Sequence, residues 1–574
     1  MMQVYLPKLL YGSQYAERLP IGKKYVLKNF DYSEVRNFYK AWYRPDLIAV
    51  GDLPVEEIEK KIKEHFSKIP AVENLKTREI YKLSNHEETF IAVATDKEAA
   101  FSNVQLMYKD REDAKVSSTY GDYRDDIVIQ LFYTMINNRL NELTNKPNPP
   151  FVFANSYYGG TYARSKNAYQ SFGFTSAEGQ LKALKVLLEE NKRVKEYGFL
   201  ESEIDRARKS ILSRIEKQYK DRDKRESGRI VGEYIRNFLK DEAMPGIEEE
   251  FRLYKTFLPS IKIEEVNALI QNYIHDDNQV IIFTGAEKDG VKVPTEQEIK
   301  ELLEEVEASK IEPYAEDEVP TSLISELPAA VTVAETIMNK DLDATTLVLS
   351  NGAKVTYKIT DYKNDEVLLQ GHSAGGMSLL TDEEIQQIGF ADGGLTSAGI
   401  GGLSLTDMQK FMSGKIARVR PYISNSEEGF NGSASPKDLE TMFQMIYLYF
   451  TDLNMDEEAY QTFVDKQKGF LGNLMANPSF YFSNEVGNYK NEGNTRYLGF
   501  PTSKKMDESD YALAYKKYQE RFADASDFHF YLVGNVAETE VKRLSEQYLA
   551  TLPSTNSKET VVVPEFRPAD KNDK

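Results

Sequence analysis

Gly371-His372-Ser373-Ala374-Gly375 is the segment of this sequence that comes nearest to a catalytic motif. It fits the G-x-S-x-G pattern of a nucleophile elbow, in which glycines permit the strained turn that exposes a serine. An apolar strand pattern precedes it, but residues 377–380 are predicted to be extended where the motif requires a helix. The one histidine downstream, His529, falls within an apolar strand pattern. We therefore keep Ser373 only as an alternative nucleophile and expect a glycine-rich strand end.

Residues that could bind a metal are scarce. The sequence contains no cysteine, which excludes disulfides, a thiol nucleophile and Cys-ligated zinc. Neither H-E-x-x-H nor the inverted H-x-x-E-H motif occurs, and no phosphate loop or dinucleotide fingerprint is complete. We therefore predict no metal-ligating and no cofactor-binding residue in this chain. The five histidines are His65, His86, His275, His372 and His529.

The charge balance is acidic. The 574 residues include 91 acidic and 72 basic side chains, which gives a formal net charge of −19. This balance argues against nucleic-acid binding, which needs a basic surface. No stretch approaches the roughly 18 apolar residues of a membrane-spanning helix, and the first ten residues lack the pattern of a signal peptide. We expect either a cytosolic protein or one whose sequence continues upstream of Met1.

One pattern occurs three times: an amphipathic helix, a short polar break, an apolar strand and a glycine. The copies end at Gly51, Gly285 and Gly534, which are 234 and 249 residues apart. This spacing is too long for a solenoid and indicates a duplicated domain. The predicted helices and strands of the three copies are residues 33–42 and 47–50, 264–273 and 280–283, and 511–522 and 528–533.

The repeat divides the chain into modules. Residues 51–70 align without gaps with residues 534–553, and in both the pattern predicts a helix that ends at a proline. The acidic, proline-containing segment 312–320 has no periodicity and is predicted to be a linker. The predicted parts are the end of a first module (1–75), a second module (76–311), a linker between two halves (312–340), a third module (341–556) and a tail (557–574).

Local patterns favour an α+β fold. Apolar stripes predict long helices around residues 127–143 and 204–219, and residues 89–94 and 104–108 are predicted strands. Asn351-Gly352 between two strand patterns predicts a hairpin, because this dipeptide accepts the positive φ angles of a type I′ turn. The predicted fold is therefore α+β, built from repeated two-layer modules, each an antiparallel sheet covered by helices.

Two segments resemble the pitrilysin/insulinase family of zinc metallopeptidases, namely residues 12–22 (GSQYAERLPIG) and 38–47 (FYKAWYRPDL). Residues 349–355, 397–401 and 411–415 also resemble parts of the longer bacterial members. The resemblance spans essentially the whole chain. It implies modules of the pitrilysin and mitochondrial-processing-peptidase type, arranged as two halves that close around a peptide.

The resemblance also implies a catalytic scheme. In the family, H-x-x-E-H supplies two zinc-binding histidines and a glutamate base, and a further glutamate is the third ligand. No residue of this chain matches those positions. The motif would precede Met1, and the equivalent helix of the third module, near residues 383–387, has no histidine. A final module after the third is also missing, so we expect zinc in a full-length parent and none in this chain.

We therefore expect the noncatalytic central portion of a pitrilysin-like zinc metalloendopeptidase that degrades or processes peptides in a closing chamber. Alone, the chain is expected to be inactive. Its expected partners are peptide substrates and the missing N-terminal and C-terminal modules. The alternatives are a genuinely noncatalytic peptide-binding or partner subunit of the same family, and a serine hydrolase that uses Ser373. Exported bacterial relatives favour the cell envelope over the cytoplasm.

Overall fold

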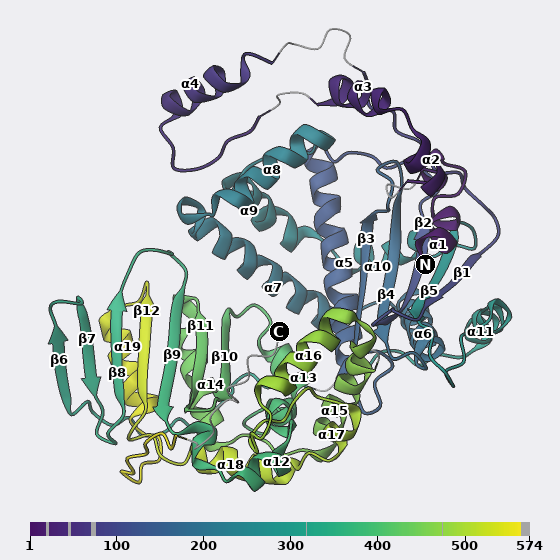
Figure 1. Ribbon diagram of the computed structural model, residues 1–574. Helices are drawn as coiled ribbons and strands as arrows, with labels where there is room; N and C mark the ends of the chain where they lie inside the picture. Colours follow the sequence, from purple (N-terminus) through teal and green to yellow (C-terminus); the bar gives the residue numbers. More distant parts are fainter. Residues whose placement is uncertain (19–21, 44–46, 70–75, 317, 473, 564–574) are drawn as a thin grey trace.

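Two β-sheets organise the molecule, as the computed structural model in Figure 1 shows. The structure describes residues 1–18, 22–43, 47–69, 76–316, 318–472 and 474–563. The first sheet has five strands in the order β1-β5-β2-β4-β3, and the second has seven in the order β10-β11-β9-β12-β8-β7-β6. Helices pack on both sheets, and the predicted α+β fold class is confirmed.

Helices cover one face of the first sheet. Its strands are β1 (Phe90–Asp96), β2 (Ser102–Lys109), β3 (Phe153–Gly160), β4 (Asn167–Thr175) and β5 (Gln279–Ala286). The covering helices include α5 (Tyr120–Thr144), α6 (Gln180–Tyr197) and α10 (Ile263–Tyr273). Val104 and Leu106 are fully buried against these helices, whereas Asn103 and Gln105 are partly exposed, because strand side chains point to opposite faces in turn.

The second sheet has a separate core. Its strands are β6 (Glu335–Asn339), β7 (Ala344–Val348), β8 (Lys354–Ile359), β9 (Val367–Ala374), β10 (Ala417–Ile423), β11 (Glu427–Ala434) and β12 (His529–Gly534). The core contains side chains of α14 (Leu439–Thr451), α18 (Tyr511–Arg521) and α19 (Glu538–Leu544) packed on one face of the sheet. Strand β6 lies within residues 312–340, which the sequence pattern assigns to a linker; all five of its residues are exposed, so no burial period marks it.

The second and third copies of the repeat occupy equivalent positions. Strand β5 follows α10 and lies between β1, to which it is parallel, and β2, to which it is antiparallel. Strand β12 follows α18 and lies between β8, to which it is parallel, and β9, to which it is antiparallel. Each sheet is therefore antiparallel except for one parallel pair that the repeat strand makes.

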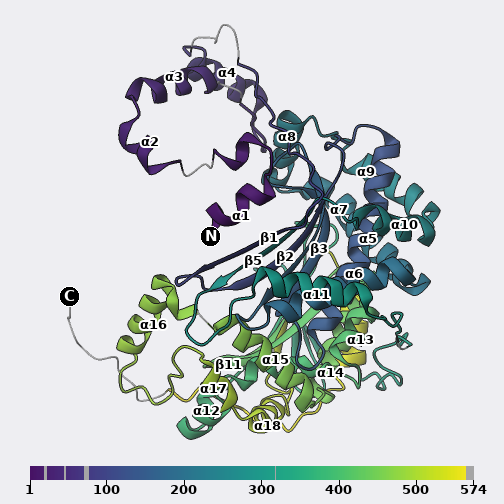
Figure 2. The same ribbon diagram turned by 90° about the vertical axis from the view of Figure 1, so that its right-hand side faces the viewer.

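The first copy of the repeat is different. Helices α3 (Tyr32–Trp42) and α4 (Val55–Phe66) form, but residues 47–50 form no strand, so that prediction is wrong. A strand needs neighbours to accept and donate its backbone hydrogen bonds, and the described part of the chain provides no strand next to this segment. Figure 2 shows α2 (Lys24–Asn29), α3 and α4 projecting away from the rest of the molecule, and none of the three contains a buried residue.

Two local predictions are also corrected. The hairpin at Asn351-Gly352 joins β7 to β8, but only Gly352 has a positive φ, of 96°, so the turn is not type I′. The Asn351 side chain instead donates to the carbonyl groups of Leu549 and Leu552, which ties the turn to the end of the module. Residues 376–379 form a short 3₁₀ helix and not an extended segment; Gly375 before it and Gly376 at its start both have positive φ, which turns the chain out of strand β9.

The remaining helices complete both layers and the connections. They are α1 (Met2–Leu9), α7 (Glu201–Lys220), α8 (Ser227–Lys240), α9 (Ile247–Phe257), α11 (Glu296–Ala308), α12 (Asp382–Ile388), α13 (Leu405–Phe411), α15 (Glu457–Leu471), α16 (Pro478–Lys490) and α17 (Ser503–Asp507). Among the described residues, none of the helices combines the length and the apolar character that crossing a membrane requires.

Candidate functional site

Ser373 lies inside strand β9 and not at an exposed turn. Its side chain faces the helix-covered side of the sheet, where it is 1% exposed and sits opposite Glu428 of β11. His372 faces the other side, because neighbouring strand residues alternate. Both ring nitrogens of His529 are engaged, Nε2 with Thr356 Oγ1 at 2.7 Å and Nδ1 with a tyrosine hydroxyl at 2.9 Å. The fold therefore gives Ser373 neither of these histidines as a base.

Glu428 is a buried carboxyl that the sequence patterns did not single out. It is 0% exposed, and burial raises its pKa to about 7. One carboxylate oxygen accepts a hydrogen bond from the backbone N–H of Gly376 at 2.6 Å. The sequence did contain one sign of this burial. Glu428 lies two residues before the fully buried Phe430 in the same strand, so its side chain points to the same face, where an apolar residue is expected.

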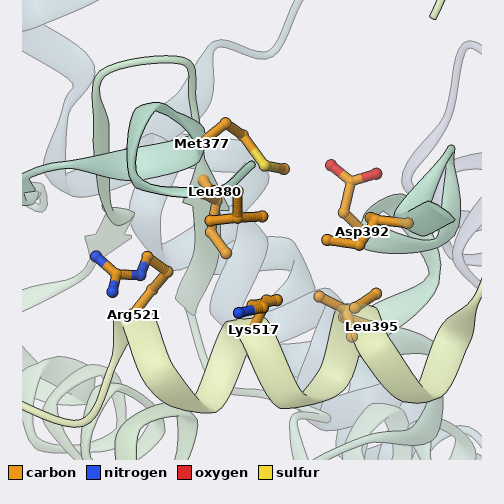
Figure 3. Close-up of a pocket in the computed structure, with 9 residues that line it drawn as sticks. Met377, Leu380, Asp392, Leu395, Lys517 and Arg521 are labelled. Atoms are coloured by element: carbon orange, nitrogen blue, oxygen red, sulfur yellow. The ribbon is translucent and has the colours of Figure 1, made fainter. Parts of the chain in front are cut away.

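A small cavity lies between α18 and the loop after β9. Figure 3 shows Lys517 and Arg521 of α18 on one side, Met377 and Leu380 opposite them, and Asp392 at the edge. Its volume of about 10 Å³ holds at most a water molecule. Both cations are already paired with acids of this chain. The cavity is therefore part of the packing and not a ligand site.

The histidines do not form a metal site. His86 stacks on Phe90 with ring centroids 3.9 Å apart, His275 Nδ1 lies 2.8 Å from an oxygen of Asp277, and His65 is exposed on α4. Within the part of the chain that the structure describes, no three histidine, aspartate or glutamate side chains converge as metal ligands would. The residues present here do not fit a zinc ion.

The second sheet has one uncovered face. In Figure 1, α14 and α19 lie behind this sheet, and no helix crosses its front. The strand register defines three rows of side chains across this uncovered face. From β10 to β8 the rows are Tyr422, Gly429, His372, His529 and Lys354; Arg420, Asn431, Gln370, Tyr531 and Thr356; and Arg418, Ser433, Leu368, Val533 and Lys358.

Aromatic side chains form the centre of the uncovered face. The rings of His529 and Tyr531 are 4.1 Å apart and nearly parallel, and His372 stacks on Tyr531 at 5.6 Å. Partial burial, together with Lys354 and His372, lowers the pKa of His529 to about 4, so this ring is neutral at pH 7. Because Leu368 and Val533 lie in the next row, the centre offers apolar contacts and uncharged hydrogen-bonding groups.

A buried charge cluster joins the helices of the first sheet to the segment between the sheets. Arg139 of α5 is 2% exposed and pairs with Glu203 of α7 at 2.7 Å and with Glu190 of α6 at 3.2 Å. Its guanidinium lies 4.2 Å from the ring centroid of Tyr314. The Tyr314 hydroxyl donates a hydrogen bond to Glu142 at 2.8 Å. Each buried charge therefore has a partner, as burial requires.

The same cluster reaches the second sheet. Lys410 of α13 lies 3.4 Å from Glu142 and 3.6 Å from Glu316. Glu316 also pairs with Arg206 of α7 at 2.5 Å. Helices of both sheets therefore contact residues 314–316 through charged groups, which fixes the segment between the sheets against both of them.

A second, open cavity lies beside the projecting N-terminal segment. It has a volume of about 540 Å³ and is lined by residues 48–51 and by Tyr234, Asn237 and Phe238 of α8. Helix α8 contains no buried residue, and its apolar side chains face this space or solvent. Exposed apolar side chains gathered in this way are typical of a surface that contacts another molecule.

Comparison with known proteins points to a peptidase family. Residues 29–211 match the family model described as the peptidase M16 inactive domain. The chain is 28% identical over 552 residues to a zinc protease PQQL-like protein of Arabidopsis thaliana, and 20% identical over 552 residues to the probable zinc protease PqqL of Haemophilus influenzae. These alignments cover 95% of this chain but 52% and 58% of the relatives. The chain thus spans between half and three fifths of the length of the curated relatives it matches.

A solved structure shares the fold. It is a mutant of the ferredoxin protease FusC in complex with Arabidopsis ferredoxin, with a TM-score of 0.59, 17% identity, and coverage of 99% of this chain and 62% of that one. The matched domain and the shared fold are those of proteins with M16 peptidase modules, to which this chain is similar. The matched domain and these relatives make the chain similar to the pitrilysin/insulinase family of proteases. Its relatives are named zinc proteases, whereas its own described residues do not fit zinc.

Proposed function

We propose that this chain is the noncatalytic central portion of a pitrilysin-like zinc metalloendopeptidase, in which it forms part of a chamber wall and the hinge. One observation carries the proposal. In its second and third copies the repeat places a strand in the middle of a sheet, whereas the described residues of the first copy, 32–43 and 47–51, include no buried residue. We infer that the first copy completes the sheet of a further module, and that this module carries H-x-x-E-H.

The exposed side chains of the first copy support this. Leu47 corresponds to Phe530 of β12, counting back from the glycine that ends each copy. Phe530 is 0% exposed and Leu47 is 46% exposed. The 540 Å³ cavity between residues 48–51 and α8 is open to solvent and has room for a few side chains of such a module. A strand that pairs with residues 47–50 would satisfy their backbone groups and bury their apolar side chains together.

The two sheets supply the remaining parts of the proposal. The uncovered face of the second sheet provides a wall on which a peptide could lie. The cluster around Arg139 and Tyr314 provides a hinge whose two sides are held by ion pairs. Because this chain's residues do not fit zinc, we assign cleavage to the other module and peptide holding to this chain. We place the protein in the cell envelope, as the resemblance to exported bacterial members suggests.

The first test is the chemistry of the chain alone. Purified chain is expected to contain no stoichiometric zinc by elemental analysis and to show no chelator-sensitive cleavage of a labelled peptide mixture. Stoichiometric zinc or such cleavage would contradict a noncatalytic role.

The second test uses the single tryptophan, Trp42 of α3. Iodide should quench its fluorescence in the chain alone. Addition of an H-x-x-E-H module from a relative should shift the emission to shorter wavelength and reduce the quenching, because the docked helix is buried. Unchanged fluorescence at saturating module would contradict docking of the first repeat copy.

A second candidate from the same family is a partner subunit that binds peptides without being joined to a catalytic module. The exposed first copy of the repeat favours docking in either case. The coding sequence on both sides of this chain separates the two: a continuous frame that encodes H-x-x-E-H supports the peptidase, and a separate frame supports the subunit.

A further inference from the structure

The uncovered face of the second sheet is positively charged although the protein is strongly acidic. Its three rows contain Arg418 and Arg420 on β10 and Lys354 and Lys358 on β8. From β10 to β8 these rows contain no acid; Glu427 and Glu366 lie at the two ends of the strands. The whole chain has a formal net charge of −19. The four cations in these rows therefore give this face a charge opposite in sign to that of the whole chain.

These four cations have no ion pair with any described residue of the chain. Arg418 donates to Ser433 Oγ at 2.9 Å, and Lys358 donates to a backbone carbonyl oxygen at 2.8 Å. The acids at the strand ends have other partners: Glu427 accepts a hydrogen bond from Tyr422, and Glu366 lies 3.8 Å from a lysine of α7. The row of Lys354 continues through β7 to Glu335 of β6, two strands away from the lysine. The guanidinium and ammonium groups are therefore free to bind carboxylates from outside.

The cations stand in two groups with an apolar centre between them. Strands β10 and β8 are four positions apart in the sheet, which corresponds to about 19 Å at roughly 4.8 Å per strand. The space between is occupied by the aromatic rings of His372, His529 and Tyr531 and by Leu368 and Val533. An extended peptide of eight residues, about 26 Å long at roughly 3.3 Å per residue, would reach both groups.

We propose that this face binds extended, acidic peptide segments, with carboxylates on the two cationic flanks and apolar side chains on the aromatic centre. The proposal rests on the proposed function, because it names the substrate class of the chamber wall. The negative charge of the rest of the chain repels such a segment from other surfaces, while the cationic face attracts it. The charge distribution therefore directs an acidic peptide to this face and disfavours peptides of other charge there.

The experiment measures binding of labelled octapeptides to the full chain by fluorescence anisotropy. Each peptide has a Thr-Val-Leu-Thr centre and two identical residues at each end, which are glutamate, glutamine or lysine. The glutamate peptide should bind about tenfold more tightly than the glutamine peptide at low salt, and the difference should shrink as salt screens the charges. The lysine peptide should bind most weakly.

A pair of matched variants locates the effect. Arg418→Gln/Arg420→Gln should weaken binding of the glutamate peptide roughly fivefold, the size expected for two exposed ion pairs. Lys310→Gln/Lys542→Gln changes the net charge equally, at exposed lysines outside this face, and should leave binding unchanged. Hydrogen exchange should show peptide-dependent protection in β9, β10 and β12.

The outcomes separate the two proposals. Equal binding of the glutamate and glutamine peptides, or equal loss in both double variants, would overturn the acidic preference and leave the wall proposal standing. Protection outside β9, β10 and β12 would overturn both, because the peptide would then not lie on this face. Absence of binding by all three peptides would overturn both.

Discussion

The guanidinium of Arg139 lies 4.2 Å from the ring of Tyr314, and this contact joins a core helix of the first sheet to the segment that leads to the second. Cation–π contacts are strongest where water is excluded, and Arg139 is almost completely buried. The same tyrosine holds Glu142, which in turn faces Lys410 of the second sheet's helices. The relative placement of the two sheets therefore depends on a small number of buried polar contacts.

Removal of Arg139 should be severely destabilising. Arg139→Leu leaves Glu190 and Glu203 buried without their shared partner, and loss of one member of a buried ion pair costs about 3–5 kcal/mol. Tyr314→Phe keeps the ring and removes only the hydrogen bond to Glu142, so about 1 kcal/mol is expected. Urea unfolding followed by circular dichroism measures both. Tyr362→Phe, at an exposed tyrosine, is the control, and an Arg139→Leu variant as stable as this control would refute the role of the cluster.

Glu428 should make stability fall as the pH rises. Its pKa in the folded protein is about 7, above the ordinary 4.5, so the folded state holds the proton more tightly than the unfolded state between these values. The stabilisation is complete below about pH 4.5 and is lost by about pH 7; it amounts to about 3 kcal/mol at about 1.36 kcal/mol per pKa unit. Glu428→Gln should therefore equal the wild type near pH 4.5 and exceed it in free energy of unfolding at pH 8. Glu326→Gln, at an exposed glutamate, should show no such pH dependence, and a pH-independent difference for Glu428→Gln would contradict the assignment.

Corresponding residues of the repeat should respond differently to the same substitution. Phe530→Ala in the core of the second sheet should cost about 3–5 kcal/mol. Leu47→Ala at the matching position of the first copy should change the free energy of unfolding by less than about 0.5 kcal/mol, since the side chain is exposed. Leu47→Asp should abolish the Trp42 fluorescence change on docking. A large stability loss for Leu47→Ala would show that the segment is already packed in the chain alone.

Ser373→Ala should leave any hydrolytic activity of the purified chain unchanged. The serine is buried and has neither His372 nor His529 as a base, so it cannot reach a substrate carbonyl. A p-nitrophenyl ester assay of wild type and variant measures this. Loss of an esterase activity in Ser373→Ala, with unchanged circular dichroism, would restore the serine-hydrolase alternative.

Much of the fold could be predicted because its signals are local. The periodicity of residues 127–143 predicted α5, and the repeat predicted the helix–strand pairs α10–β5 and α18–β12. The prediction of a strand at residues 47–50 was wrong for a physical reason. Strand formation depends on neighbouring strands, which sequence periodicity does not reveal. The prediction of a type I′ turn was wrong because the Asn351 side chain donates hydrogen bonds to residues about 200 positions away in the chain.

The sequence by itself predicted the resemblance to a peptidase family and the repeated helix–strand pattern, and it contains no H-x-x-E-H motif, because motifs and periodicity are carried by residues close together in the chain. Only the tertiary structure decided where side chains from distant strands meet. Arg420, Gln370 and Tyr531 share one row because the strand register places them side by side, and Glu428 is buried because α18 and the loop after β9 close over it. The cationic face and the Arg139 cluster both arise from long-range packing, which no short stretch of sequence encodes.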